Sequence, residues 1–143
     1  MCQKSGRKQG PNEKTGSTTQ EDMQTIIALV DDLFFASKIR GTAEQIGRRV
    51  QFVKSIPSAV EKARDDVPVL IIADLNASSC DPLDLARSLK RDDSLGGIPL
   101  LGFFSHVQLE LQQAAIEAGY DQVIPRSAFT KNLPDILAGS NLA

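Results

Sequence analysis

From residue 25 onward the chain alternates between short apolar runs and longer stretches in which apolar residues recur every three or four positions. Three runs are almost continuously apolar, at residues 25–30, 67–73 and 98–104, and two shorter segments with apolar residues, at residues 51–54 and 122–124, are typical of short strands. Runs of this length predict β-strands, and the lack of polar alternation in the longer ones predicts that both faces of the sheet are buried.

The stretches between these runs predict helices. Ser58 and Glu61 form a capping-box pattern, which predicts that the second helix begins there. Asp81 followed by Pro82 predicts the start of the third helix, because Asp is a favoured N-cap and Pro suits the first helical position. The first helix is predicted from apolar residues at helical spacing: Phe35, Ile39, Ala43, Ile46 and Val50.

A fourth helix is predicted over residues 107–118, with Gly119 as its natural stop. A short final helix is predicted over residues 131–138, with Pro134 in its first turn or at a kink. The order is therefore a strand followed by a helix, five times over. This order predicts a doubly wound α/β fold with a five-stranded parallel sheet, and no internal repeat or second domain is evident.

Composition limits the class of protein. At 143 residues the chain is long enough for one domain, which we place at residues 25–143. Residues 1–24 lack aromatic residues and periodicity, so we expect a disordered tail. The net charge of −2 argues against direct binding to nucleic acid. No apolar run approaches the roughly 18 residues of a membrane span. We expect a cytoplasmic protein that binds no membrane.

The first polar side chains after the apolar runs are of a restricted kind. The first strand is followed by Asp31 and Asp32, the third by Asp74, the fourth by Ser105 and the fifth by Arg126. Ligands of doubly wound sheets bind outside the carboxyl ends of the strands. In a 2-1-3-4-5 arrangement these four strands are neighbours, so we expect the five side chains to converge on one pocket.

This set of side chains suggests two kinds of chemistry. Crowded carboxylates repel one another unless a cation compensates, and Mg²⁺ suits one or two carboxylates together with a phosphate. A carboxylate can also act as a nucleophile and form an aspartyl phosphate. Ser105 could then donate a hydrogen bond to a phosphoryl oxygen, and Arg126 could pair with either a carboxylate or a phosphoryl group.

In this ordered set the sequence resembles the receiver domain of two-component response regulators. L-V-D-D at residues 29–32 looks like the family's acidic pair, and V-L-I-I-A-D-L-N at residues 69–76 looks like its phosphoacceptor strand. Asp81 matches an acidic loop residue, Ser105 the family's Thr or Ser, and Arg126 the place of a lysine. The resemblance implies a flavodoxin-like, CheY-like fold with strand order 2-1-3-4-5.

The resemblance also implies a function. Asp74 would accept a phosphoryl group from a sensor histidine kinase or a phosphotransfer protein. Mg²⁺ would be held by Asp32, Asp74 and the backbone carbonyl of Asn76, with Asp31 in support. The chain would be a stand-alone receiver, without an output domain, that signals by binding an unknown downstream protein.

Several positions depart from the family pattern, and they concern the switch rather than the acidic residues. Arg126 replaces a lysine, and its planar guanidinium is not equivalent to a point charge. Ser127 replaces a proline, so we expect a trans peptide bond before it. Val123 replaces the usual switch aromatic. His106 replaces a small residue and could narrow access to the pocket, and Pro82 replaces a glycine.

Two functions therefore remain open from the sequence. The first is the phosphoaccepting receiver. The second is a pseudo-receiver, an interaction module that works without phosphorylation, in which Arg126 forms a permanent salt bridge with Asp74. An enzyme is not expected, because an aspartate-nucleophile phosphohydrolase would carry a second aspartate where this chain has Asn76.

Overall fold

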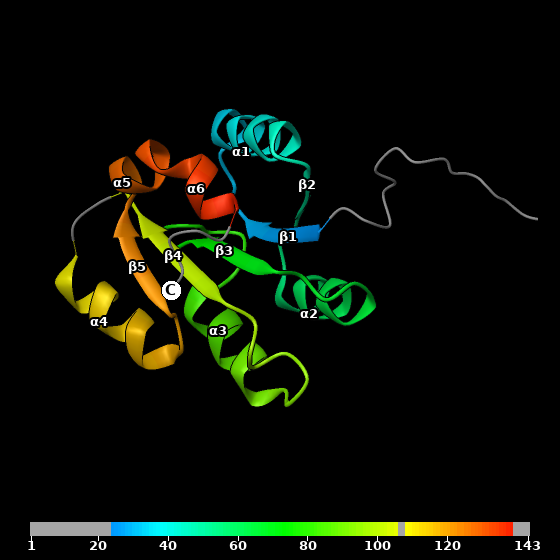
Figure 1. Cartoon of the computed structure of the whole chain (residues 1–143). Helices are drawn as coiled ribbons and strands as arrows, with labels where there is room; N and C mark the ends of the chain where they lie inside the picture. Colours follow the sequence, from blue (N-terminus) through cyan, green and yellow to red (C-terminus); the bar gives the residue numbers. More distant parts are fainter. Residues whose placement is uncertain (1–23, 106–107, 139–143) are drawn as a thin grey trace, which may run out of the picture.

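The computed structural model of the chain describes residues 24–105 and 108–138. Five strands form one parallel sheet (Figure 1). Their order is β2-β1-β3-β4-β5, which confirms the predicted arrangement. The strands are β1 (Gln24–Leu29), β2 (Arg48–Phe52), β3 (Leu70–Asp74), β4 (Leu100–Phe104) and β5 (Gln122–Pro125).

Helices cover both faces of the sheet, as the doubly wound fold requires (Figure 1). One face carries α1 (Leu33–Gln45), α5 (Arg126–Lys131) and α6 (Leu133–Leu137). The opposite face carries α2 (Ile56–Asp65), α3 (Pro82–Arg91) and α4 (Leu109–Ala118).

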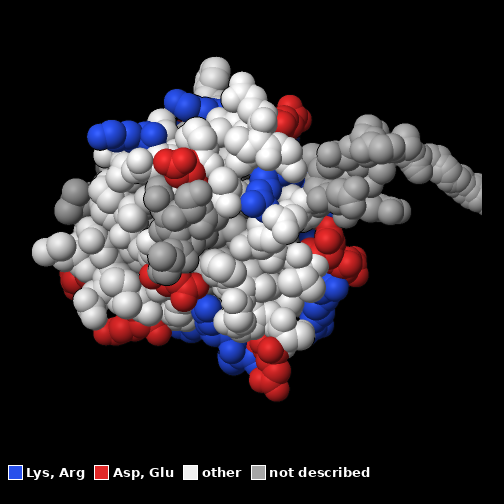
Figure 2. All heavy atoms as spheres, in the orientation of Figure 1, with Lys and Arg blue, Asp and Glu red and all other residues white. Residues whose placement is uncertain are grey.

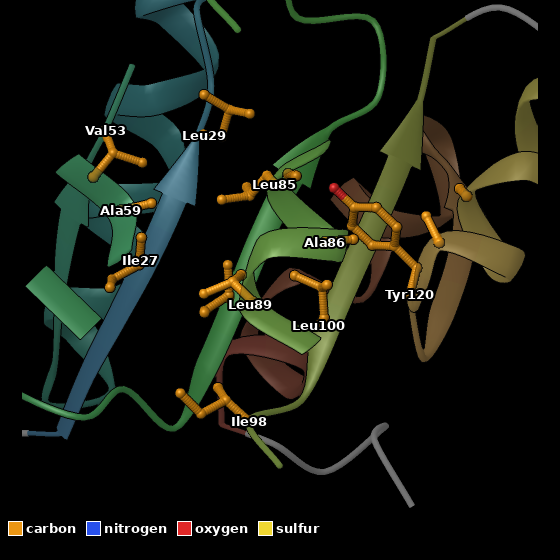
Figure 3. Close-up of a cluster of buried hydrophobic side chains, with 14 of the residues drawn as sticks. Ile27, Leu29, Val53, Ala59, Leu85, Ala86, Leu89, Ile98, Leu100 and Tyr120 are labelled. Carbon is orange, nitrogen blue, oxygen red and sulfur yellow. The ribbon is translucent and has the colours of Figure 1, made fainter. Parts of the chain in front are cut away.

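The sheet divides the interior into two apolar cores because successive side chains of a strand point to opposite faces. In β1, Ile27 and Leu29 contribute to the core under α2, α3 and α4. Figure 3 shows this core, where both side chains lie among residues of the neighbouring strands and helices. Ile26 and Ala28 contribute to the other core, under α1, α5 and α6. β1 therefore contributes side chains to both cores.

Three phenylalanines join the helices to the sheet on the α1 side. The ring of Phe103 in β4 stacks on Phe129 of α5, with centroids 4.6 Å apart, and meets Phe35 of α1 edge-on at 5.2 Å. All three are almost fully buried. Aromatic pairs in these geometries stabilise a fold beyond the area that they bury.

The helix starts agree with the sequence in one case and differ in another. Asp81 is the N-cap of α3, and its carboxylate accepts a hydrogen bond from the Leu83 amide, as predicted. The prediction that the second helix begins at Ser58 is wrong. The N-cap of α2 is Ser55, whose hydroxyl accepts a hydrogen bond from the Ser58 amide. The early start is favoured because Pro57 is tolerated in the first helical turn.

Further boundaries differ from the prediction. β2 (Arg48–Phe52) begins three residues before the strand predicted at residues 51–54. The apolar stripe of the first helix does not reach Val50, because α1 ends at Gln45 and Val50 lies in β2. The final helix predicted over residues 131–138 corresponds to α6, with Pro134 in its first turn as expected, and the short helix α5 that precedes it was not predicted. Gly119 ends α4 as predicted, with φ of 127°, a conformation that few other residues adopt.

The surface in Figure 2 carries interspersed positive and negative side chains, in keeping with the small net charge. In the part of the chain that the structure describes, no helix has both the length and the apolar character needed to cross a bilayer. The tail predicted at residues 1–24 lies outside the described residues, apart from Gln24, which begins β1.

Candidate functional site

The carboxyl ends of four strands bring the predicted residues to one edge of the sheet. Asp31 and Asp32 follow β1, Asp74 is the last residue of β3, Ser105 follows β4 and Arg126 follows β5. Because the strands are parallel and in register, these positions share the edge at which doubly wound folds bind ligands.

Asp74 is the buried member of this group. Asp74 is 8% exposed, and its side-chain Oδ1 accepts a hydrogen bond from the backbone amide of Asn76 at 2.9 Å. Burial raises the pKa of the Asp74 carboxyl, because it disfavours the charged form. The Asn76 amide and the charge of Arg126 act against this rise, whereas Asp31 and Asp32 add to it. The environment of Asp74 thus disfavours the ionised form of its carboxyl group.

Asp32 lies at the rim and is the N-cap of α1. Its Oδ1 accepts hydrogen bonds from the amides of Phe34 at 2.9 Å and Phe35 at 3.2 Å. Its Oδ2 lies 3.0 Å from Nη2 of Arg126. The hydrogen bond from Arg126 and those from the helix amides lower the pKa of Asp32, so this carboxylate is ionised at neutral pH.

Arg126 is placed by two contacts on α1. Besides the ion pair with Asp32, its guanidinium carbon lies 4.1 Å from the centroid of the Phe35 ring, a cation–π geometry. The salt bridge that the structure forms is therefore to Asp32, and not to Asp74 as the pseudo-receiver hypothesis expected. Arg126 acts on Asp74 only through its charge.

Asp31 is held by the loop between β3 and α3. Its carboxylate accepts hydrogen bonds from the amides of Ser78 and Ser79, at 2.9 and 3.2 Å, and from the Ser79 hydroxyl at 2.7 Å. Burial alone would raise the pKa of Asp31, but the hydrogen bonds from Ser79 and Ser78 outweigh it, and the pKa is lowered. These serines were not predicted, and their only signal in the sequence is a polar pair in a loop that follows Asp74.

Asn76 and Ser105 are linked by a hydrogen bond. The side-chain Oδ1 of Asn76 accepts a hydrogen bond from the backbone amide of Ser105 at 2.8 Å. The sequence had suggested a role for the backbone carbonyl of Asn76 and for the hydroxyl of Ser105. The structure shows instead that the Asn76 side chain connects the segment after β3 to the end of β4.

The acidic residues have the oxygen donors that Mg²⁺ prefers, but their arrangement does not fit a metal site. Asp31 is turned toward Ser78 and Ser79, and Asp32 is held by Arg126 and the first turn of α1. Within residues 24–105 and 108–138, no group of three or more His, Cys, Asp or Glu side chains is placed to hold a metal ion.

The remaining predicted positions surround the edge. Val123 is half-buried and packs against the core under α2, α3 and α4. Ser127 lies exposed in α5, and the bond before it is trans, as expected. His106 lies outside the described residues. Tyr120, which was not predicted as part of the site, is buried and donates a hydrogen bond to the Pro82 carbonyl at the start of α3.

No protein-family model and no curated protein matches this chain. Solved structures do match it. The chemotaxis protein CheY4 of Vibrio cholerae is 17% identical, with a TM-score of 0.71 over 82% of this chain and 98% of that one. The phosphorylated cyanobacterial phytochrome response regulator RcpA is 20% identical, with a TM-score of 0.67 over 82% and 90%. The Mn²⁺-bound response regulator Rcp1 is 17% identical, with a TM-score of 0.65 over 81% and 90%. The chain thus has the fold of a CheY-like response regulator receiver domain.

Proposed function

We propose that this chain is a receiver module of phosphorelay signalling that accepts a phosphoryl group on Asp74 and acts by binding other proteins. The position of Asp74 carries the proposal. Asp74 lies at the carboxyl end of β3, the middle strand of the sheet. Asp32 and Ser105 follow the two adjacent strands, and Arg126 follows β5 at the edge. Similarity to a phosphorylated response regulator supports this assignment.

The donor would be a phosphohistidine of a sensor histidine kinase or a phosphotransfer protein. One carboxylate oxygen of Asp74 would form the new bond to phosphorus while the P–N bond of the donor breaks, and the released imidazole would take up a proton. Ser105 and Arg126 would then donate hydrogen bonds to the phosphoryl oxygens. The downstream partner would recognise the surface that these contacts reshape.

In this proposal Mg²⁺ would be held by Asp32, Asp74 and the Asn76 carbonyl, with Asp31 in support, in an arrangement of side chains that differs from the one described above. The similarity to an Mn²⁺-bound response regulator supports a divalent cation at this edge. Asp32 is not available to it while Arg126 occupies Oδ2.

The ion pair between Arg126 and Asp32 also favours a second function. If Arg126 and the two serines keep Asp32 and Asp31 engaged, the chain would serve as an interaction module that works without phosphorylation. The fold would be the same in both cases. The second function differs in that Asp74 stays unmodified and the partner recognises a surface that no phosphoryl group reshapes.

Incubation with Mg²⁺ and acetyl phosphate, followed by intact-mass spectrometry, tests the first function. The expected result is a gain of one phosphoryl group, which Asp74→Asn abolishes and Asp84→Asn, at an exposed position of α3, leaves unchanged. Beryllofluoride with Mg²⁺ should shift the amide signals of Asp74 and Ser105. If neither reagent modifies the wild-type protein, the phosphoacceptor function is excluded and the second function stands.

A further inference from the structure

An open groove of about 400 Å³ lies between α2 and α3, two helices on the same face of the sheet (Figure 1). Its apolar wall is formed by Ile56, Pro57 and Val60 of α2. Ala59 and Ala63 of the same helix are buried against the sheet, so the apolar surface of α2 continues from the core to the outside of the domain. An apolar wall at the surface is an area that a binding partner can cover.

The end of the groove at the C-termini of α2 and α3 is charged, and part of this charge is already compensated. Arg64 of α2 donates hydrogen bonds to Oδ2 of Asp92, the C-cap of α3, from Nη2 and, at 3.0 Å, from Nε. The other oxygen, Oδ1, accepts hydrogen bonds from the backbone amide of Ser94 at 2.9 Å and from its hydroxyl at 2.7 Å. Both oxygens of Asp92 are therefore engaged, and its charge offsets that of Arg64.

Arg91 of α3 is the second cation that lines the groove. Its side chain is exposed and donates a long hydrogen bond, at 3.4 Å, to the Ser88 hydroxyl. Arg64 pairs with Asp92, whereas Arg91 forms no ion pair with any residue that the structure describes. An arginine in this position, beside an apolar wall, suits a ligand that carries a carboxylate next to an apolar group.

We infer that the groove between α2 and α3 binds an acidic peptide segment of a partner protein, which places an aliphatic side chain against Val60 and a carboxylate on Arg91. The inference rests on the proposed function only in taking the chain to bind other proteins, because the groove shares no residue with the site around Asp74. The planar guanidinium of Arg91 supplies paired donors for the carboxylate, and the ion pair with Asp92 fixes Arg64 at the same end of the groove.

Two other classes of ligand fit the groove less well. A small molecule is usually enclosed over most of its surface, but this groove is open, and Pro57, Arg64 and Arg91 in its lining are exposed. Nucleic acid is held by several cations along its phosphates, whereas the two arginines described here share the lining with Asp92. A peptide segment needs neither enclosure nor a row of cations, because the rest of it belongs to the partner protein.

Selection on the full chain from a phage-displayed library of random short peptides tests the inference. Enriched peptides should combine aliphatic residues with Asp or Glu. Their affinity, measured by fluorescence anisotropy, should fall about tenfold for Arg91→Glu, because an attraction is replaced by a repulsion. Lys131→Glu is the matched control and should leave the affinity unchanged, since it makes the same change of charge at an exposed position of α5, on the opposite face of the sheet.

The inference is overturned if no acidic peptide is enriched, or if the enriched peptides bind Arg91→Glu as tightly as the wild type. Competition by single-stranded DNA or by free glutamate that matches the peptide would also overturn it, because the groove would then be a site for nucleic acid or for a small anion.

A second measurement uses the wild-type protein alone. On titration with an enriched peptide, the amide signals of Val60 and Ser88 should shift, while that of Phe129, in the core on the other face of the sheet, should not. Shifts confined to other surfaces would count against the groove as the binding site and overturn the inference. Failure of the phosphoacceptor function gives a different result, because peptide binding in the groove continues when no phosphoryl adduct forms.

Discussion

The side chain of Asn76 accepts a hydrogen bond from the backbone amide of Ser105, with 2.8 Å between Oδ1 and the amide nitrogen. Asn76 belongs to the segment that follows β3, and Ser105 is the first residue after β4. The Asp74 carboxylate in turn accepts a hydrogen bond from the Asn76 amide. Asn76 therefore connects the predicted phosphoacceptor to the end of the next strand through two hydrogen bonds, one from its backbone and one to its side chain.

Asn76→Ala should release the Ser105 amide. The bond lies at an exposed position, so we expect a loss of about 0.5–1 kcal/mol in the free energy of unfolding. Hydrogen exchange measured by NMR should show faster exchange at Ser105 than in the wild type. Gln113→Ala, which removes an exposed hydrogen bond on α4, should leave exchange at Ser105 unchanged. Unaltered exchange in Asn76→Ala would contradict the role given to this side chain.

Asp74→Asn should stabilise the protein at neutral pH. Because burial raises the pKa of Asp74, the folded state holds this proton more tightly than the unfolded state does. The stability that the protonated carboxyl contributes is complete below its unfolded pKa and is lost as the pH rises through the folded pKa. Urea unfolding should therefore show a gain for Asp74→Asn at pH 7 that shrinks as the pH falls through the raised folded pKa toward the unfolded value of about 4, below which the wild-type carboxyl is protonated in both states.

Asp31→Asn provides the comparison of opposite sign. The pKa of Asp31 is lowered, so its contribution to stability is present above the unfolded pKa and is lost as the pH falls through the folded pKa. This variant should be less stable than the wild type at pH 7. If both variants shift stability in the same direction, the electrostatic account of the two carboxylates is incorrect.

Tyr120→Phe should lower the free energy of unfolding by about 1 kcal/mol, because it removes the 2.7 Å hydrogen bond from the buried hydroxyl to the Pro82 carbonyl. Burial also raises the pKa of Tyr120, so the folded state keeps a proton that the unfolded chain releases above about pH 10. Wild-type stability should fall as the pH rises above this value, and Tyr120→Phe should remove that part of the slope.

Absorbance at 295 nm checks the alkaline behaviour directly, because Tyr120 is the single tyrosine of the chain. The tyrosinate signal should appear together with the loss of helical circular dichroism. Ionisation that precedes unfolding would show that the hydroxyl is accessible in the folded protein.

Gly102→Ala and Gly41→Ala should act in opposite directions. A Cβ on Gly102 in β4 would lie 3.0 Å from the Leu75 side chain and 3.1 Å from the Tyr120 ring, so we expect a loss of about 1–3 kcal/mol. A Cβ on Gly41 in α1 meets nothing within 4 Å, and the higher helix propensity of alanine should give a gain of up to about 1 kcal/mol. Thermal unfolding of the two variants measures both effects.

The strands and the placement of the site were predictable because each depends on a local pattern. Apolar runs identify strands that are buried on both faces, and the first polar residue after each run necessarily lies near the carboxyl edge of a parallel sheet. Asp74, Ser105 and Arg126 reach that edge for this reason.

The contacts within the site could not be predicted in the same way. The choice of Asp32 over Asp74 by Arg126 depends on the Phe35 ring, which packs beside the salt bridge only after α1 has docked on the sheet. The start of α2 was missed because Ser55 and Ser58 can both cap a helix, and the intervening Pro57 is compatible with the earlier start. The partner of Arg126 and the start of α2 depend on side-chain geometry and tertiary packing, which the spacing of residues in the sequence does not reveal.

The packing of α6 against α1 has a consequence for synthesis of the chain. The apolar face of α1, with Phe35 and Ile39, is buried in part by Leu133 and Ile136, which follow about 100 residues later. At a translation rate of about 5–20 residues per second, this face waits for roughly 5–20 seconds before its partners are made. The nascent domain thus leaves the core beside α1 incomplete until α6 has been made, and a chaperone that shields the start of α1 would act during that interval.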